Sequence, residues 1–72
     1  MAAASNTRRA CRITRVLAAY RRDDPHAPQR QHVVDLLTDV RHFCDRQMIS
    51  FSNCLALADR HFLAETAQEE KA

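Results

Sequence analysis

The chain of 72 residues contains no glycine and only two prolines. Tight β-hairpins and left-handed helix ends normally use glycine, so its absence argues against a β-sheet. Both prolines, Pro25 and Pro28, lie in residues 23–28, which form the one clear helix-breaking segment. We therefore expect an all-α fold with one pronounced break in its first half.

The cysteines are few and show no motif. Cys11, Cys44 and Cys54 are an odd number without CxxC spacing, and no secretory apolar segment precedes them. This pattern is typical of a reducing compartment, so we expect a cytoplasmic protein without disulfides. We interpret all three cysteines as small apolar residues.

Long apolar runs are also missing. The longest is only a few residues, whereas about 20 are needed to cross a bilayer, so no membrane partner is expected. At this length the chain is one domain over residues 1–72 and buries only about 60% of the surface that it exposes when unfolded. Forming a homodimer is one way for so small a chain to bury leftover apolar surface.

Charge is distributed unevenly. Residues 1–30 contain seven arginines and two aspartates, which gives a net charge of +5, whereas residues 31–72 contain four basic and seven acidic side chains, which gives −3. Such an asymmetry can serve a partner molecule or join one protomer to another.

The first helix is expected at about residues 6–22, because Ser5 or Asn6 can cap its first turn. Its apolar stripe recurs at helical spacing and consists of Ala10, Ile13, Val16, Leu17 and Tyr20. The opposite side has a row of four arginines: Arg8, Arg12, Arg15 and Arg22.

This arginine row allows two interpretations. It could follow the phosphates of a nucleic acid. It could equally be the solvated face of a surface helix, and the lack of interleaved aromatic residues favours that interpretation. The first 22 residues also have the composition of a mitochondrial presequence, but their removal would leave about 50 residues with a very small core, so we treat the helix as part of the fold.

The second helix is expected at about residues 28–47, with Pro28 at the first helical position. It has the strongest apolar pattern and is predicted to be the central core helix, through Val33, Leu36, Leu37, Val40, Phe43 and Cys44. Its other side carries Asp35, Asp39, His42 and Arg46. Carboxylates with a histidine can hold a metal ion, but a solvated ladder of charges has the same spacing and is the favoured interpretation, because one exposed face offers few converging ligands.

The third helix is expected at about residues 51–66, because Ser50 suits the N-cap and Ile49 and Cys54 are spaced as a hydrophobic staple. The second and third helices would form an αα-hairpin packed on the basic N-terminal helix. Residues 1–4 and 67–72 lack an apolar pattern and are expected to fray. The apolar stripe of this third helix is Phe51, Cys54, Leu55, Leu57, Ala58 and Phe62.

His61 and Glu65 lie one turn apart at the edge of this stripe. Such a pair can act as a general base or bind a metal, but no nucleophile with a recognisable spacing accompanies it, which favours a simple hydrogen-bonded pair. Leu63 lies off the stripe and is a candidate partner contact. No catalytic residue, metal or cofactor is predicted, and we do not expect an enzyme.

Part of the chain is similar to known proteins. Residues 34–45, from Val34 to Asp45, together with the later residues Phe51, Leu55, Ala58, His61, Phe62 and Glu65, resemble short uncharacterised helical proteins encoded by bacterial mobile elements such as phages, plasmids and integrative elements. The resemblance covers roughly half the chain and implies a small accessory factor or an inhibitor of a host defence complex, which acts by occupying a surface. We therefore expect a protein-binding module whose partner is a host or mobile-element protein, with nucleic-acid binding as the alternative.

Overall fold

The computed structural model describes residues 2–71 of the chain, and the side-chain surroundings of residues 6–69. It contains three helices, α1 (Ala2–Asp23), α2 (Gln29–Arg46) and α3 (Phe51–Lys71), and no strand within the described range. The prediction of a small all-α, three-helix fold is confirmed.

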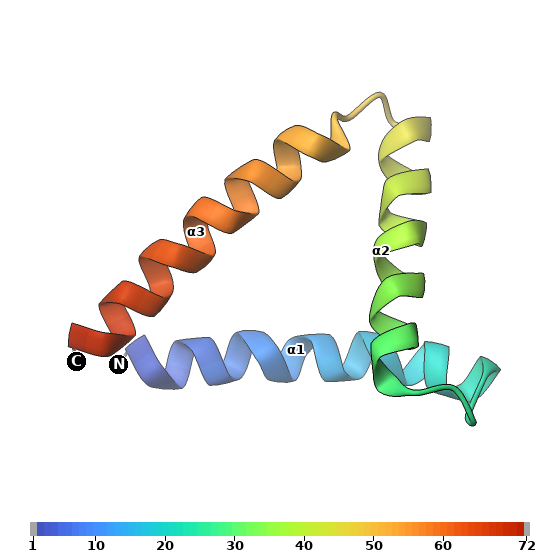
Figure 1. Cartoon of the computed structure of the whole chain (residues 1–72), viewed down its shortest axis with the longest axis horizontal. Coiled ribbons are helices and arrows are strands. Elements are labelled where there is room, and N and C mark those ends of the chain that lie inside the picture. Colours follow the sequence, from blue (N-terminus) through green and yellow to red (C-terminus); the bar gives the residue numbers. More distant parts are fainter. Residues whose placement is uncertain (1, 72) are drawn as a thin grey trace.

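The helices form the three sides of an open triangle (Figure 1). α2 leaves the end of α1 at a steep angle, and α3 returns so that its last turns lie beside the start of α1. The Cα atoms span 39 × 31 × 15 Å, so the molecule is flat. None of the described helices is long and apolar enough to cross a lipid bilayer.

Two helices are longer than the sequence indicated. α1 begins at Ala2 rather than near residue 6, and α3 continues to Lys71 rather than ending near residue 66. These added turns consist mainly of alanine, glutamine, glutamate and lysine, which have high helix propensity even without an apolar stripe. The expected fraying of residues 2–4 and 67–71 is therefore corrected, while residues 1 and 72 lie outside the described range.

The first corner joins α1 to α2 around a buried histidine. Pro28 is the N-cap of α2, not its first helical residue, with φ −65° and ψ 153°. His32 is only 2% exposed, and its Nε2 lies 2.9 Å from the carbonyl oxygen of Asp24. Since a carbonyl can only accept, Nε2 donates this bond, which ties the start of the α1–α2 connection to the first turn of α2.

The second corner contains a left-handed helix end without glycine. Gln47 is the C-cap of α2, and Met48 follows it with φ 59°. The amide of Ile49 donates to the carbonyl of Cys44 at 2.9 Å, and the amide of Met48 donates to that of Asp45 at 3.4 Å. These are the two hydrogen bonds of a Schellman motif, so the absence of glycine did not exclude such a cap.

α3 begins as the sequence predicted. The hydroxyl oxygen of Ser50 accepts a hydrogen bond from the backbone amide of Asn53 at 3.2 Å. This satisfies one of the first-turn amides that a helix leaves unpaired, so Ser50 is confirmed as the N-cap.

The molecule has almost no apolar core. Among the described side chains, Leu17 and Cys44 are the only apolar ones that are buried. The prediction that α2 is a central core helix is therefore wrong, because helices that diverge from their corners leave their apolar sides uncovered. The large apolar side chains that stay exposed are Ile13, Val16, Val33, Val34, Leu37, Val40, Phe43, Met48, Ile49, Leu55, Leu57, Phe62 and Leu63.

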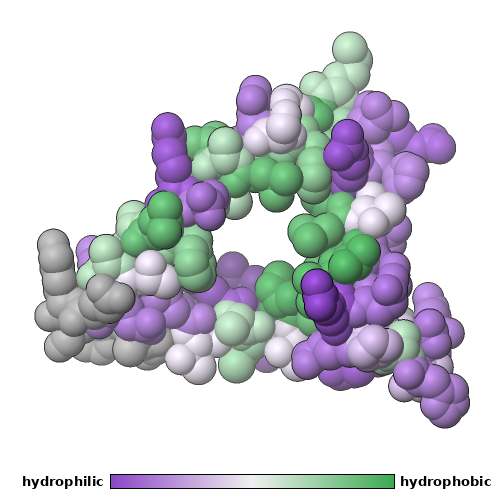
Figure 2. Space-filling view, viewed as in Figure 1, coloured by the Kyte–Doolittle hydropathy of each residue, from purple (hydrophilic) through white to green (hydrophobic). Residues whose placement is uncertain are grey.

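The space-filling view shows where apolar atoms gather. Figure 2 shows an opening through the middle of the triangle, bounded on all three sides by apolar side chains, while hydrophilic residues occupy much of the outer edge. The apolar stripes thus face a common space that the chain itself does not fill.

Candidate interaction surfaces

An apolar groove lies near the corner between α2 and α3. It has a volume of about 280 Å³ and is lined by Val34, Leu37, Thr38, Arg41, Phe51 and Leu55. We call this set the corner groove. The guanidinium carbon of Arg41 lies 5.6 Å from the centre of the Phe51 ring, a distance typical of a cation–π contact, so the groove has one cationic edge.

A second pocket lies at the corner where α3 returns to α1. It has a volume of about 400 Å³, and its lining residues are Asn6, Arg9, Ala10, Phe62, Glu65, Thr66 and Glu69. The lining is contributed by both ends of the chain, which only the tertiary fold brings together.

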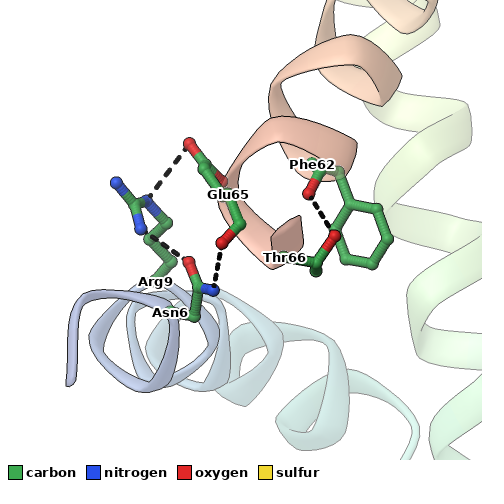
Figure 3. A network of polar contacts seen from close by, with 5 residues as sticks. All are labelled: Asn6, Arg9, Phe62, Glu65 and Thr66. Carbon is green, nitrogen blue, oxygen red and sulfur yellow. Dashed lines mark hydrogen bonds and ion pairs between the residues drawn. The ribbon is translucent and has the colours of Figure 1, made fainter. Parts of the chain in front are cut away.

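Polar contacts close this corner (Figure 3). The side-chain amide of Asn6 donates to the backbone carbonyl of Glu65 at 3.2 Å, and Arg9 lies 3.5 Å from the Glu65 carboxylate. Arg9 also donates to the side-chain oxygen of Asn6 at 2.6 Å. The ring of Phe62 points away from this network and remains exposed, so the pocket combines a polar side with an apolar one.

The predicted arginine row is partly assembled on the outer side of α1. Arg8, Arg12 and Arg15 line an exposed hollow of about 370 Å³ together with Cys11, while Arg22 is not part of its lining. At 100° per residue, the buried Leu17 lies opposite Arg8 on α1. The arginines therefore point away from the side of α1 that packs on the rest of the chain.

The predicted polar cluster on α2 is not one site. Asp39 accepts a hydrogen bond from the hydroxyl of Tyr20 at 2.7 Å, which links α1 to α2, whereas Asp35 accepts from Gln31 within α2 at 2.9 Å. His42 is exposed on the same helix. Within the part of the chain that the structure describes, no three histidine, cysteine, aspartate or glutamate residues are placed to share a metal ion.

The expected pairing of His61 with Glu65 is replaced by another contact. Glu65 is half-buried against α1 and forms its ion pair with Arg9, whereas His61 is exposed. The spacing of four residues between His61 and Glu65 predicts a pair within one helix. It gives no information about α1, which only the tertiary fold brings next to Glu65. Leu63 is exposed, as expected for a residue off the stripe.

The contact with Asp39 changes the acidity of Tyr20. The hydrogen bond to Asp39 raises the pKa of the phenol above its ordinary value of 10.0, with smaller contributions from burial and from the negative charges of Asp39, Asp35 and Asp23. Each of these effects disfavours the phenolate, because ionisation would remove the donated proton and add a negative charge beside carboxylates.

Three polar residues organise the corners in ways that the sequence did not predict: Asn6, Arg9 and His32. Asn6, a candidate N-cap from the sequence, lies inside α1, which begins at Ala2. His32 shares one side of α2 with Leu36 and Phe43, at helical spacings of four and eleven, and this is the signal that could have found it. The contact of Asn6 and Arg9 with Glu65 has no local signal. Of the cysteines interpreted as small apolar residues, only Cys44 is buried, and all three are free thiols.

No family model matches the chain, and no match is found among curated proteins or solved structures.

Proposed function

We propose that the chain is a non-enzymatic protein-binding module whose binding surface is the apolar rim of the central opening. The carrying observation is the exposure of large apolar side chains on all three helices, arranged around a common space. Exposed apolar surface that is continuous over several elements is typical of protein interaction sites.

The corner groove supports this proposal in detail. It presents the aliphatic side chains of Val34, Leu37 and Leu55 beside an aromatic ring and an arginine. Aromatic and arginine side chains are enriched among the residues that dominate binding energy at protein interfaces. The outer edge of the triangle is more hydrophilic, so the groove and the rim form the surface best suited to a protein partner.

The resemblance to proteins of bacterial mobile elements gives this module a setting. There it would be a cytoplasmic accessory factor, or an inhibitor that occupies a surface of a host defence complex. Its partner would be a host or mobile-element protein.

A matched pair of leucines on α3 tests the binding surface. Leu55 lines the corner groove and is 47% exposed. Leu57, which apolar periodicity assigns to the same stripe, is 49% exposed but lies about 160° around the helix from Leu55, on the outer side of α3 and not on the rim. We expect Leu55→Glu to reduce the recovery of a stoichiometric protein partner from nuclease-treated host lysate by about ten-fold or more, because a carboxylate would be buried in an apolar contact.

Leu57→Glu is the control and should retain the partner. Circular dichroism of both variants verifies that the helices persist. Equal recovery by the two variants would contradict binding through the corner groove.

A second candidate function is nucleic-acid binding by the outer side of α1. The clustering of Arg8, Arg12 and Arg15 around one hollow favours it, because three guanidinium groups on one face can each pair with a phosphate.

Salt dependence tests this candidate. Binding to duplex DNA should weaken with a log–log slope of about 0.9 per phosphate contacted. Replacing Arg8, Arg12 and Arg15 with glutamine should abolish binding, whereas the same change at Arg30, Arg46 and Arg60 removes equal charge from other helices and should preserve most of it. Binding that ignores salt, or that falls equally in both triple variants, would eliminate this candidate.

A further inference from the structure

We propose that the occupant of the open apolar face is a second copy of this chain, in a two-fold dimer of six helices. This inference rests on the proposed function, and it makes a second copy of the chain, in place of a host protein, the molecule that the apolar rim binds.

The exposed area is too large for a monomer of this size. The chain has a mass of 8.3 kDa and exposes 6263 Å², whereas folded monomers of that mass expose about 4,600 Å². The excess is about 1,700 Å². A stable interface removes about 800 Å² from each partner and an obligate homodimer about 1,000 to 2,500 Å², so the excess matches one obligate interface.

The dimensions lead to the same conclusion. The radius of gyration over Cα atoms is 14.4 Å, whereas a compact domain of 72 residues has about 11 Å and one of twice that length about 14.5 Å. The chain is thus as broad as a protein with twice its residues, yet only 15 Å thick. Domains normally pack two layers of elements around a core, and a second flat copy supplies the missing layer.

Two-fold symmetry suits the residues on this face. In an isologous interface each surface meets the same surface of the other copy, so the aliphatic groove of one chain can pack on the apolar rim of its partner. Charge selects the orientation. α1 carries six arginines and one aspartate, a net charge of +5, whereas α3 carries two basic and four acidic residues, a net charge of −2.

This difference disfavours contact between two α1 helices, where like charges would meet. It favours an arrangement in which α1 of one copy lies along α3 of the other. By symmetry, the dimer then has two such pairings of a basic helix with an acidic one, on either side of the apolar contact.

Sedimentation equilibrium of the purified full chain, combined with circular dichroism, tests the dimer. We expect a mass of two chains at micromolar concentration and a melting temperature that falls on dilution, because unfolding would accompany dissociation. Leu55→Glu should weaken association by about 100-fold or more, since the dimer buries the substituted side chain twice, whereas Leu57→Glu should leave the dimer mass unchanged.

A helical wild-type chain with the mass of a single copy across this range, and with a melting temperature independent of concentration, would overturn the dimer. The wild-type measurement decides the question even if Leu55→Glu fails to fold. If that monomer still captured a lysate protein through Leu55, the proposed binding function would stand without the dimer; if Leu55→Glu and Leu57→Glu behaved alike in both assays, both proposals would fall.

Discussion

Tyr20 and Asp39 form the hydrogen bond that joins the sides of α1 and α2. Its donor is the only tyrosine of the chain, and there is no tryptophan. The ionisation of a single phenol can therefore be followed optically without interference from another residue of its kind.

We expect the pKa of Tyr20 to lie above 10.0 in the folded protein and to move toward that value in Asp39→Asn, which removes the strongest cause of the shift. A raised folded-state pKa means that the contact stabilises the fold below the unfolded pKa, and that this stabilisation is lost as pH rises through the folded pKa. Ultraviolet titration of the phenolate measures the pKa of Tyr20 in the wild type and in the variant. Asp45→Asn, on the same helix, is the control and should leave the curve unchanged; an unaltered curve in Asp39→Asn would refute the assignment.

At the scale of the elements, the end of α2 combines good hydrogen bonding with a strained residue. Met48 occupies the left-handed position that glycine takes in most Schellman motifs, and its side chain is 95% exposed. Its β-carbon makes this conformation costly, by about 1 kcal/mol or more, and the side chain gains no packing in return.

Met48→Gly should therefore stabilise the fold by about 0.5 to 1 kcal/mol, after allowance for the greater freedom of glycine in the unfolded chain. For a domain of this size, 1 kcal/mol corresponds to about 4 to 8 °C in melting temperature. Thermal unfolding followed by circular dichroism measures the change. Met48→Ala keeps the β-carbon and should show no comparable gain, and an equal gain in both variants would show that backbone strain is not the cause.

The elements also show what the sequence could predict. The spacing of apolar residues and the Ser50 cap are local signals, and both were sufficient to place the helices. Apolar periodicity alone makes α1 and α3 too short, because the helix propensity of alanine and glutamate extends both helices beyond their apolar residues. The left-handed turn at Met48 has no sequence signal, because glycine is preferred but not required at that position.

For the whole molecule, the apolar stripes predict which sides of the helices are apolar but not what covers those sides. The stripe of α2 predicts burial, yet Val33, Val40 and Phe43 remain exposed because the angles between helices leave the centre open. Those angles depend on contacts such as Asn6 with Glu65 and His32 with Asp24, which join residues that no local pattern relates. The candidate surface could therefore be predicted residue by residue but not as a surface.

The Asn6–Arg9–Glu65 network makes the chain a ring that is covalently continuous at two corners and held by polar contacts at the third. The helices could therefore be connected in a different order along the chain and still keep the same arrangement in space. A short peptide joining the end of α3 to the start of α1, with a cut in the exposed turn at Met48, would give a circular permutant with the same three sides and its ends moved to another corner. In that permutant the corner now held by the Asn6–Arg9–Glu65 network becomes covalently linked, and the corner at the Schellman turn becomes the one where the ring can open.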